Sequence, residues 1–206
     1  MADPNGTTME VKAMRCYTAL FAMTASFCAG EVAAQDWNFD VFAGVTTENE
    51  LEWNAGDYDT DAGRIFGLGV SRSDVVVPGL ELGLEYSRSD SVYSTSDPNA
   101  ISGDALMATA RYDVVQTGGV EVYGGLGLGA VQVTFDNENV GYSRSETVGG
   151  GQVMIGARYA LTPRSKVFVE ARKLDTFEDA QVALQNSPAT AEYNATNVLI
   201  GFRQSF

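Results

Sequence analysis

The sequence predicts an all-β protein, an eight-stranded antiparallel up-and-down β-barrel that spans a membrane. Apolar and polar residues alternate with a period of two along most of the chain after residue 34, and no segment shows convincing helical periodicity. The connections between the alternating segments are short and long in turn, as in barrels with tight turns at one end. No stretch approaches the ~20 apolar residues of a membrane-spanning helix, which excludes a helical membrane protein.

Composition excludes several classes of function. The chain has 206 residues, the size of one domain, and a formal net charge of -14. Its 13 basic residues are scattered, so we expect no nucleic-acid partner, because binding phosphates requires clustered lysine and arginine. The absence of histidine excludes Ser-His-Asp and Cys-His triads and histidine-based zinc sites. We therefore predict that the protein is not an enzyme and holds no cofactor.

Residues 1–34 have the pattern of a secretory signal peptide. Lys12 and Arg15 precede the apolar stretch CYTALFAMTASFCAG, and cleavage is predicted after Ala34, with Val32 at position -3. The alternative start residues are Met1, Met9 and Met14. An amphipathic N-terminal helix is the competing interpretation. The signal peptide predicts export and leaves residues 35–206 for the barrel domain.

Eight segments have the alternating pattern expected of strands that separate two environments. They are WNFDVFAGV at 37–45, RIFGLGVSR at 64–72, LELGLEY at 80–86, LMATARYDV at 106–114, VEVYGGLGLGAVQV at 120–133, QVMIGARYAL at 152–161, VFVEARK at 167–173 and NVLIGFRQSF at 197–206.

Each segment has an apolar face and a polar or small one. In the first segment, aromatic and aliphatic residues lie on the face opposite Asp40. In the second, Phe, Leu and Val lie on the face opposite the glycines. The third places leucines opposite Glu81 and Glu85, and the fourth places Leu, Ala, Tyr and Val opposite Arg111 and Asp113. These four segments therefore predict half-buried strands.

The second half of the chain continues this pattern. The fifth segment sets valines and leucines against Glu121 and glycines, and its alternation shifts at 130–131, where we expect a β-bulge. In the last three segments the polar face carries Arg158, Glu170, Arg172 and Arg203.

The connections indicate how the strands are arranged. Those after the second, fourth and sixth strands are short (SDVVVPG, QTGG and TPRSK), and the others have about 14–20 residues. All tight turns then lie at one end, and the barrel closes so that every backbone group is paired in lipid. A soluble barrel with its apolar face inward is the competing fold. The glycine-rich, charged face favours a lumen lining, and aromatic strand ends favour a membrane: Trp37, Tyr86, Tyr112 and Tyr159.

Charged residues of both signs are predicted inside the barrel. They are Asp40, Glu81, Glu85, Asp113, Glu121 and Glu170 with Arg111, Arg158, Arg172 and Arg203. Glu81 or Glu85 could reach Arg111 on the next strand, whereas Glu170 and Arg172 lie between two arginine-bearing strands. An eight-stranded barrel is just wide enough for its side chains to fill. We therefore expect a largely filled polar lumen, with a small low-conductance porin as the alternative.

The first long loop, TENELEWNAGDYDTDAG, is rich in carboxylates. Its DYDTD run has the alternate spacing of a calcium loop, but the glycine falls one place late and Leu68 occupies the closing glutamate position. We therefore predict solvated loop acids. The alternative is a weak divalent-cation site at Asp57, Asp59 and Asp61.

From residue 36 onward the chain resembles the OmpA-like, or opacity-porin-like, family of small outer-membrane barrels. The most specific pieces are LTPRSKVFVEARK and the tail NVLIGFRQSF, although Gln204 stands where the family often has an apolar residue. The resemblance implies insertion by the barrel-assembly machinery, with Phe202 and Phe206 as the C-terminal sorting signal. Histidine-dependent activities of related barrels do not carry over to a chain without histidine.

These features together predict a protein of the outer membrane of a Gram-negative bacterium. Its expected role is structural or in surface interaction through four long extracellular loops, which are candidates to contact a host or phage surface ligand. Outer-membrane lipid and lipopolysaccharide are the other expected partners, with Arg64 and Lys173 placed to reach lipid phosphates.

Overall fold

The computed structural model describes residues 37–53, 56–59, 63–92, 99–137, 142–178, 180–184 and 187–206. The predicted signal peptide, its cleavage site at Ala34 and the alternative start residues lie outside the described residues. Among the described residues, no helix is long and apolar enough to span a membrane.

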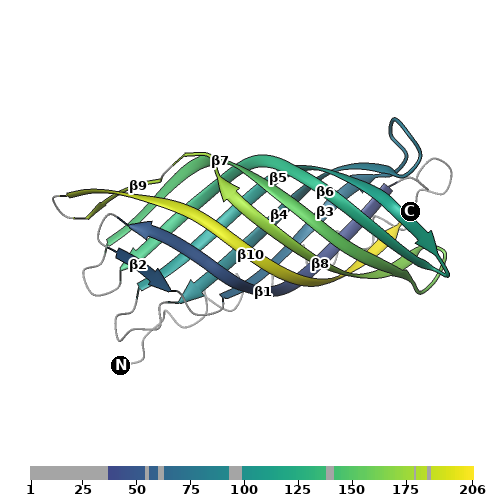
Figure 1. The fold of residues 1–206 in the computed structure, drawn as a ribbon, viewed down its shortest axis with the longest axis horizontal. Helices are drawn as coiled ribbons and strands as arrows, with labels where there is room; N and C mark the ends of the chain where they lie inside the picture. The colour runs from purple at the N-terminus through teal and green to yellow at the C-terminus, as the bar shows by residue number, and fades with distance from the viewer. Residues whose placement is uncertain are drawn as a thin grey trace, which may run out of the picture. The chain divides into compact units, whose positions relative to one another are not determined.

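Eight antiparallel strands form a closed barrel (Figure 1), which confirms the predicted fold class. They are β1 (Trp37–Trp53), β3 (Gly63–Arg72), β4 (Leu80–Val92), β5 (Asn99–Thr117), β6 (Val120–Asn137), β7 (Tyr142–Ala160), β8 (Ser165–Thr176) and β10 (Ser187–Ser205). Each strand pairs with its neighbours along the chain, and β1 pairs with β10 to close the sheet. Within the closed part of the sheet, each described barrel strand therefore has a partner on both sides.

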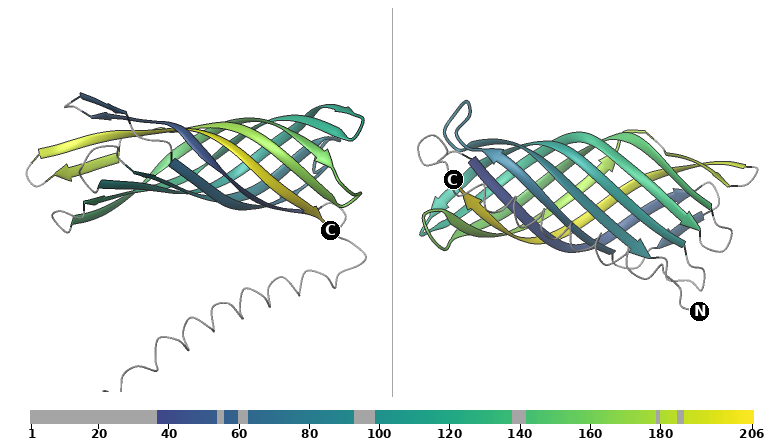
Figure 2. Two further views of the ribbon diagram at one scale, coloured as in Figure 1. Left: turned by 90° about the horizontal axis from the view of Figure 1, so that it is seen from below. Right: turned by 180° about the vertical axis from the view of Figure 1, so that it is seen from behind.

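Two short strands extend the sheet at the end with the long connections. Strand β2 (Gly56–Asp59) pairs with the end of β1, and β9 (Ala180–Leu184) pairs with the start of β10. Figure 2 shows these hairpins beyond the strands of the barrel. Parts of the connections predicted as loops are thus strands in the structure.

The tight turns lie at the opposite end, together with the C-terminus (Figure 1). They are residues 73–79, 118–119 and 161–164. Gly118 and Gly119 form the two-residue turn with φ angles of 58° and 82°, a region that favours glycine because it lacks a Cβ atom. At the seam the Phe206 N–H donates to the Trp37 carbonyl at 2.9 Å.

The barrel strands differ from the sequence prediction in length and in one bulge. Strands β5, β7 and β10 each have 19 residues, because the ladders continue beyond the segments with apolar outer faces. The prediction of a bulge at 130–131 was wrong, since Ala130 and Val131 pair in unbroken register with β5 and β7. The register shifts instead lie between Asp113 and Val115 and between Thr46 and Glu48.

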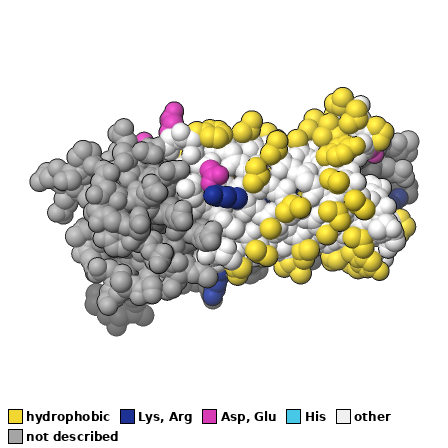
Figure 3. Space-filling view, in the orientation of Figure 1, with side chains coloured by type: hydrophobic (Ala, Val, Ile, Leu, Met, Phe, Trp, Pro, Cys, Tyr) yellow, Lys and Arg dark blue, Asp and Glu magenta, His cyan; other side chains and the backbone are white. Residues whose placement is uncertain are grey.

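Apolar side chains cover the outer face of the barrel toward the turn end. Exposed Leu, Ile, Val and aromatic residues occur on every barrel strand, including Phe66, Leu84, Leu126 and Ile200. In Figure 3 hydrophobic side chains are spread over the described part of the surface, up to the end with the turns. A closed sheet with apolar residues outside has the surface that lipid requires.

Inward-facing glycines accommodate aromatic rings that lie across the sheet. A Cβ atom on Gly156 would lie 2.5 Å from Tyr123 Cζ, and one on Gly201 would lie 2.5 Å from Phe168 Cε1. A Cβ atom on Gly67 would lie 2.7 Å from Phe42 Cε2. Since real Cβ atoms do not approach this closely, these glycines are required by the packing of the lumen.

Candidate functional site

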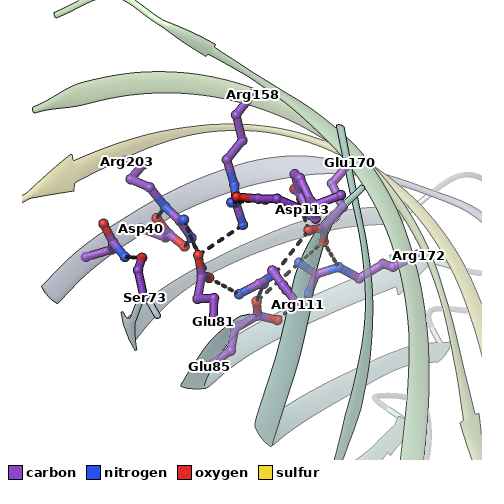
Figure 4. Close-up of polar contacts among 12 residues, drawn as sticks. Asp40, Ser73, Glu81, Glu85, Arg111, Asp113, Arg158, Glu170, Arg172 and Arg203 are labelled. Carbon is purple, nitrogen blue, oxygen red and sulfur yellow. Dashed lines mark hydrogen bonds and ion pairs between the residues drawn. The ribbon is translucent and has the colours of Figure 1, made fainter. Parts of the chain in front are cut away.

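The candidate site is a buried cluster of charged side chains inside the barrel, which Figure 4 shows in close-up. Its central members are acids and arginines from β1, β4, β5, β7, β8 and β10: Asp40, Glu81, Glu85, Glu170, Arg111, Arg158, Arg172 and Arg203. All eight side chains are buried. Strand alternation places them there, because their neighbours along each strand face outward.

Arg203 joins the strands on either side of the seam. Its guanidinium donates to Asp40 through Nε at 2.7 Å and Nη2 at 2.6 Å, and to Glu81 Oε1 at 2.8 Å. The two bonds to Asp40 form a bidentate pair, the strongest geometry for an arginine and a carboxylate.

Arg111 connects the carboxylates of β4. It donates to Glu85 Oε2 at 2.7 Å and to Glu81 Oε1 at 3.3 Å, so both of the predicted partners contact it. Arg172 donates to Glu170 Oε1 through Nε at 2.8 Å and also contacts Glu85 across the lumen. Its guanidinium lies 4.8 Å from the centre of the Phe42 ring.

Arg158 and Tyr123 complete the cluster. Arg158 pairs with Glu81 and with Asp113, each at 3.1 Å, and its guanidinium lies 4.0 Å from the centre of the Tyr123 ring. The Tyr123 hydroxyl donates to Glu170 Oε2 at 2.7 Å. Tyr123 was not identified in the sequence analysis, although its inward position on β6 follows from the same alternation.

Two placements differ from the sequence prediction. Glu121 lies apart from the central cluster, where it accepts from Lys166 Nζ at 2.6 and 2.7 Å. Lys166 was missed because it precedes the predicted strand 167–173. Arg158 and Arg203 pair with Glu81 across the lumen rather than with residues of the β8 strand that lies between β7 and β10. Reasoning from neighbouring strands does not detect such contacts.

A second, apolar cluster fills the lumen toward the loop end, and the sequence analysis missed it. Its members are Ala105, Met107, Val131, Val133, Val148, Leu174, Tyr193 and Ala195. Val131 and Val133 are fully buried because they face inward, which explains the apparent shift in the alternation of β6. A cavity of about 10 Å³ lies against this cluster, with Ser87, Ser89 and Asn197 in its lining.

The outer face of the barrel wall is apolar at the level of the charged cluster and partly polar at the level of the apolar cluster. Beside the charged cluster the outward neighbours are apolar, as with Leu84 next to Glu85 and Val169 next to Glu170. Beside the apolar cluster the outward neighbours include polar residues, of which Asp104 is half-buried and Gln132, Thr147 and Lys173 are exposed. The strands thus continue from a lipid-facing section into one with the apolar core and polar surface of a soluble barrel.

The predicted cation loop lies largely outside the described residues. Asp61 is not described, and only the backbone of Asp57 and Asp59 on β2 is. Among described residues, no group of three or more acids or cysteines has the arrangement of a metal site.

The C-terminal strand faces lipid as its alternation predicts. Val198, Ile200 and Phe202 are exposed on the outer face, and Phe206 is half-buried. Gln204 Oε1 accepts from the Ser165 hydroxyl at 2.9 Å, so the polar residue that departs from the family pattern has a partner on β8.

A closed antiparallel barrel with apolar residues outside and paired charges inside belongs to the class of transmembrane β-barrels of the outer-membrane type. A family model described as an outer membrane protein beta-barrel domain matches residues 19–206. The chain belongs to this family.

Solved structures agree with this fold. Neisserial surface protein A shares 18% identity, with a TM-score of 0.61, over 85% of this chain and 100% of that chain. The outer membrane protein OprG from Pseudomonas aeruginosa shares 13%, with a TM-score of 0.52, over 84% and 97%. Ail of Yersinia pestis, solved with the heparin analogue sucrose octasulfate, shares 13%, with a TM-score of 0.50, over 83% and 99%. No curated protein sequence matches the chain.

Proposed function

We propose that this outer-membrane barrel is a non-conducting structural protein that presents its loops at the cell surface. The observation that carries the proposal is the double filling of the lumen, by the charged cluster toward the turns and by the apolar cluster toward the loops. Ions crossing the barrel would have to separate paired, buried charges and then pass an apolar section, and both steps are costly.

Conductance of refolded protein in planar bilayers tests this proposal. We expect no channel steps at protein loads for which liposome flotation and heat-modifiable gel migration show inserted, folded barrel. Discrete steps from the wild-type chain would overturn the proposal and support the alternative, a small low-conductance porin. Glu81, Arg111 and Arg203 would then have to rearrange to open a passage.

The absence of histidine and the pairing of the lumen carboxylates support a non-enzymatic role. In the central cluster Asp40, Glu81, Glu85 and Glu170 are each paired with arginine, so none of these carboxylates is left open to act on a substrate. Incubation of folded protein with labelled lipopolysaccharide and with a casein substrate should yield no product. Turnover lost on boiling would contradict this expectation.

Surface interaction through the loops is the second component of the proposal. The ligand of Ail, a heparin analogue, does not carry over readily, because a chain with a net charge of -14 repels polyanions. A variant with shortened loops tests the structural role of the barrel separately from surface interaction through the loops. It should restore the permeability barrier of a deletion strain to a hydrophobic dye but should lose adhesion to host cells or phage adsorption. Failure to restore the barrier would contradict a structural role for the barrel itself.

A further inference from the structure

The turn between β3 and β4, residues 73–79, exposes three consecutive valines at the end of the barrel. Val75, Val76 and Val77 are 40%, 73% and 47% exposed. In Figure 1 this blue-teal turn stands away from the side of the barrel end, and in Figure 3 a dense group of hydrophobic side chains lies at that end. A contiguous apolar patch on a surface indicates contact with a partner or with lipid.

The turn has defined hydrogen bonds, so the valines are held in place. The Asp74 carboxylate accepts from the Gly79 N–H at 2.7 Å, and the Leu80 N–H donates to the Val77 carbonyl at 3.1 Å. Asp74 has a φ of 55° and is the single charged residue of the segment SDVVVPG. These bonds fix the backbone that carries the exposed valines.

The turn that carries the valines is bonded to a strand that exposes two further valines beside it. The Asp113 N–H donates to the Gly79 carbonyl at 3.0 Å and so joins the turn to β5. The next residues of β5, Val114 and Val115, are 66% and 49% exposed. The patch therefore extends the apolar band along the turn end of the barrel.

The run of outward residues without charge is shortest on the strand that leads into this turn. On β3 the outward apolar residues are Phe66, Leu68 and Val70, between Arg64 and Arg72. Four residue steps on a tilted strand span roughly 10 Å along the barrel axis, against an apolar band of about 25 Å in outer-membrane barrels. On β6 the outward residues without charge run from Val120 to Ala130. These ten residue steps span roughly 25 Å along the barrel axis, so β6 covers the full apolar band.

We propose that the β3–β4 turn lies in the inner-leaflet interface, where Val75, Val76 and Val77 contact phospholipid acyl chains. The turn supplies apolar surface on the side of the barrel where β3 supplies least. Membrane anchoring by a turn is independent of whether the lumen conducts.

The test attaches an environment-sensitive fluorophore to the thiol of a Val76→Cys variant, in a chain with Cys16→Ser and Cys28→Ser, refolded into phosphatidylcholine vesicles. Leu126→Cys on the outer face of β6 serves as the lipid reference, and Arg164→Cys in the β7–β8 turn serves as the water reference. Val77→Cys replaces Val76→Cys if the latter does not fold by heat-modifiable gel migration.

We expect nitroxide-labelled lipids to quench the label at position 76 several-fold more than the label at position 164, with emission shifted toward the blue. Quenching by aqueous iodide should be correspondingly weak. Equal behaviour at positions 76 and 164 would overturn the proposal and would leave the valines as a docking surface for a periplasmic protein.

Two further outcomes are distinguishable. Self-quenching that rises with the protein-to-lipid ratio would place a second copy of the chain on the valines and would also overturn the proposal. If position 126 itself reports water, the barrel is not inserted, and the proposed membrane function fails together with the inference.

Discussion

Replacing Arg203 by methionine tests whether the charged cluster holds the barrel together. The side chain of Arg203 is 3% exposed and binds Asp40 and Glu81. After Arg203→Met, Glu81 keeps Arg111 and Arg158, but Asp40 loses the partner that binds it in the described part of the chain. A buried carboxylate without a partner costs about 3–5 kcal/mol, so we expect a loss of this size in the free energy of unfolding.

The measurement is urea unfolding of the variant in lipid vesicles, followed by tryptophan fluorescence. The double variant Asp40→Asn, Arg203→Met should recover a substantial part of the loss, because the carboxylate left without a partner is removed. The control is Arg88→Met, which breaks an exposed pair with Asp90 and a partly exposed pair with Asp104 and should cost about 1 kcal/mol or less. Equal losses for Arg203→Met and Arg88→Met would refute the reasoning.

Three further predictions concern the packing, the tail and the loop. Gly156→Ala should lower the free energy of unfolding by about 1–3 kcal/mol in the same assay, because the added Cβ atom would displace Tyr123. The control Gly124→Ala should be neutral, because no atom lies nearer than 3.9 Å to its added Cβ atom. Equal effects of the two substitutions would contradict this account. Deletion of Phe206 should reduce the membrane-inserted fraction far more than total synthesis, as quantified by blotting of outer-membrane fractions; normal insertion would contradict a sorting role. Calorimetry of detergent-folded protein should show no heat at millimolar calcium, and saturable heat abolished by Asp57→Asn, Asp59→Asn would instead support the cation loop.

The alternation of residues was sufficient to predict the barrel and the central charges. Period-two patterning identifies the inward side of each strand, so Glu85, Arg111 and Glu170 were found without coordinates. The same criterion failed where the environment changes along a strand. Beyond Arg88 and Gln132 the outer face becomes polar, yet the ladders continue, so the predicted strands ended too early.

The partners of the charges could be predicted only in part. Glu85 and Arg111 lie on adjacent strands, where register brings them close. The contact between Arg172 and Glu85 crosses the lumen and depends on barrel diameter and strand tilt, which a pattern of residues does not contain. The inward valines of β6 were misinterpreted for a related reason, because a lumen was assumed to be polar along its whole length.

The pairing of β1 with β10 makes the contact between Asp40 and Arg203 a late event in folding. Asp40 and Arg203 are separated by 163 positions in sequence and lie on the first and last strands of the barrel. Contacts between the chain ends carry the largest loop-closure entropy, so they are expected to form after the local hairpins. Until the seam pairs, one edge of the nascent sheet carries an uncompensated carboxylate and the other an uncompensated guanidinium. Their mutual attraction favours the native seam register, and reopening the closed barrel requires Arg203 to release both Asp40 and Glu81.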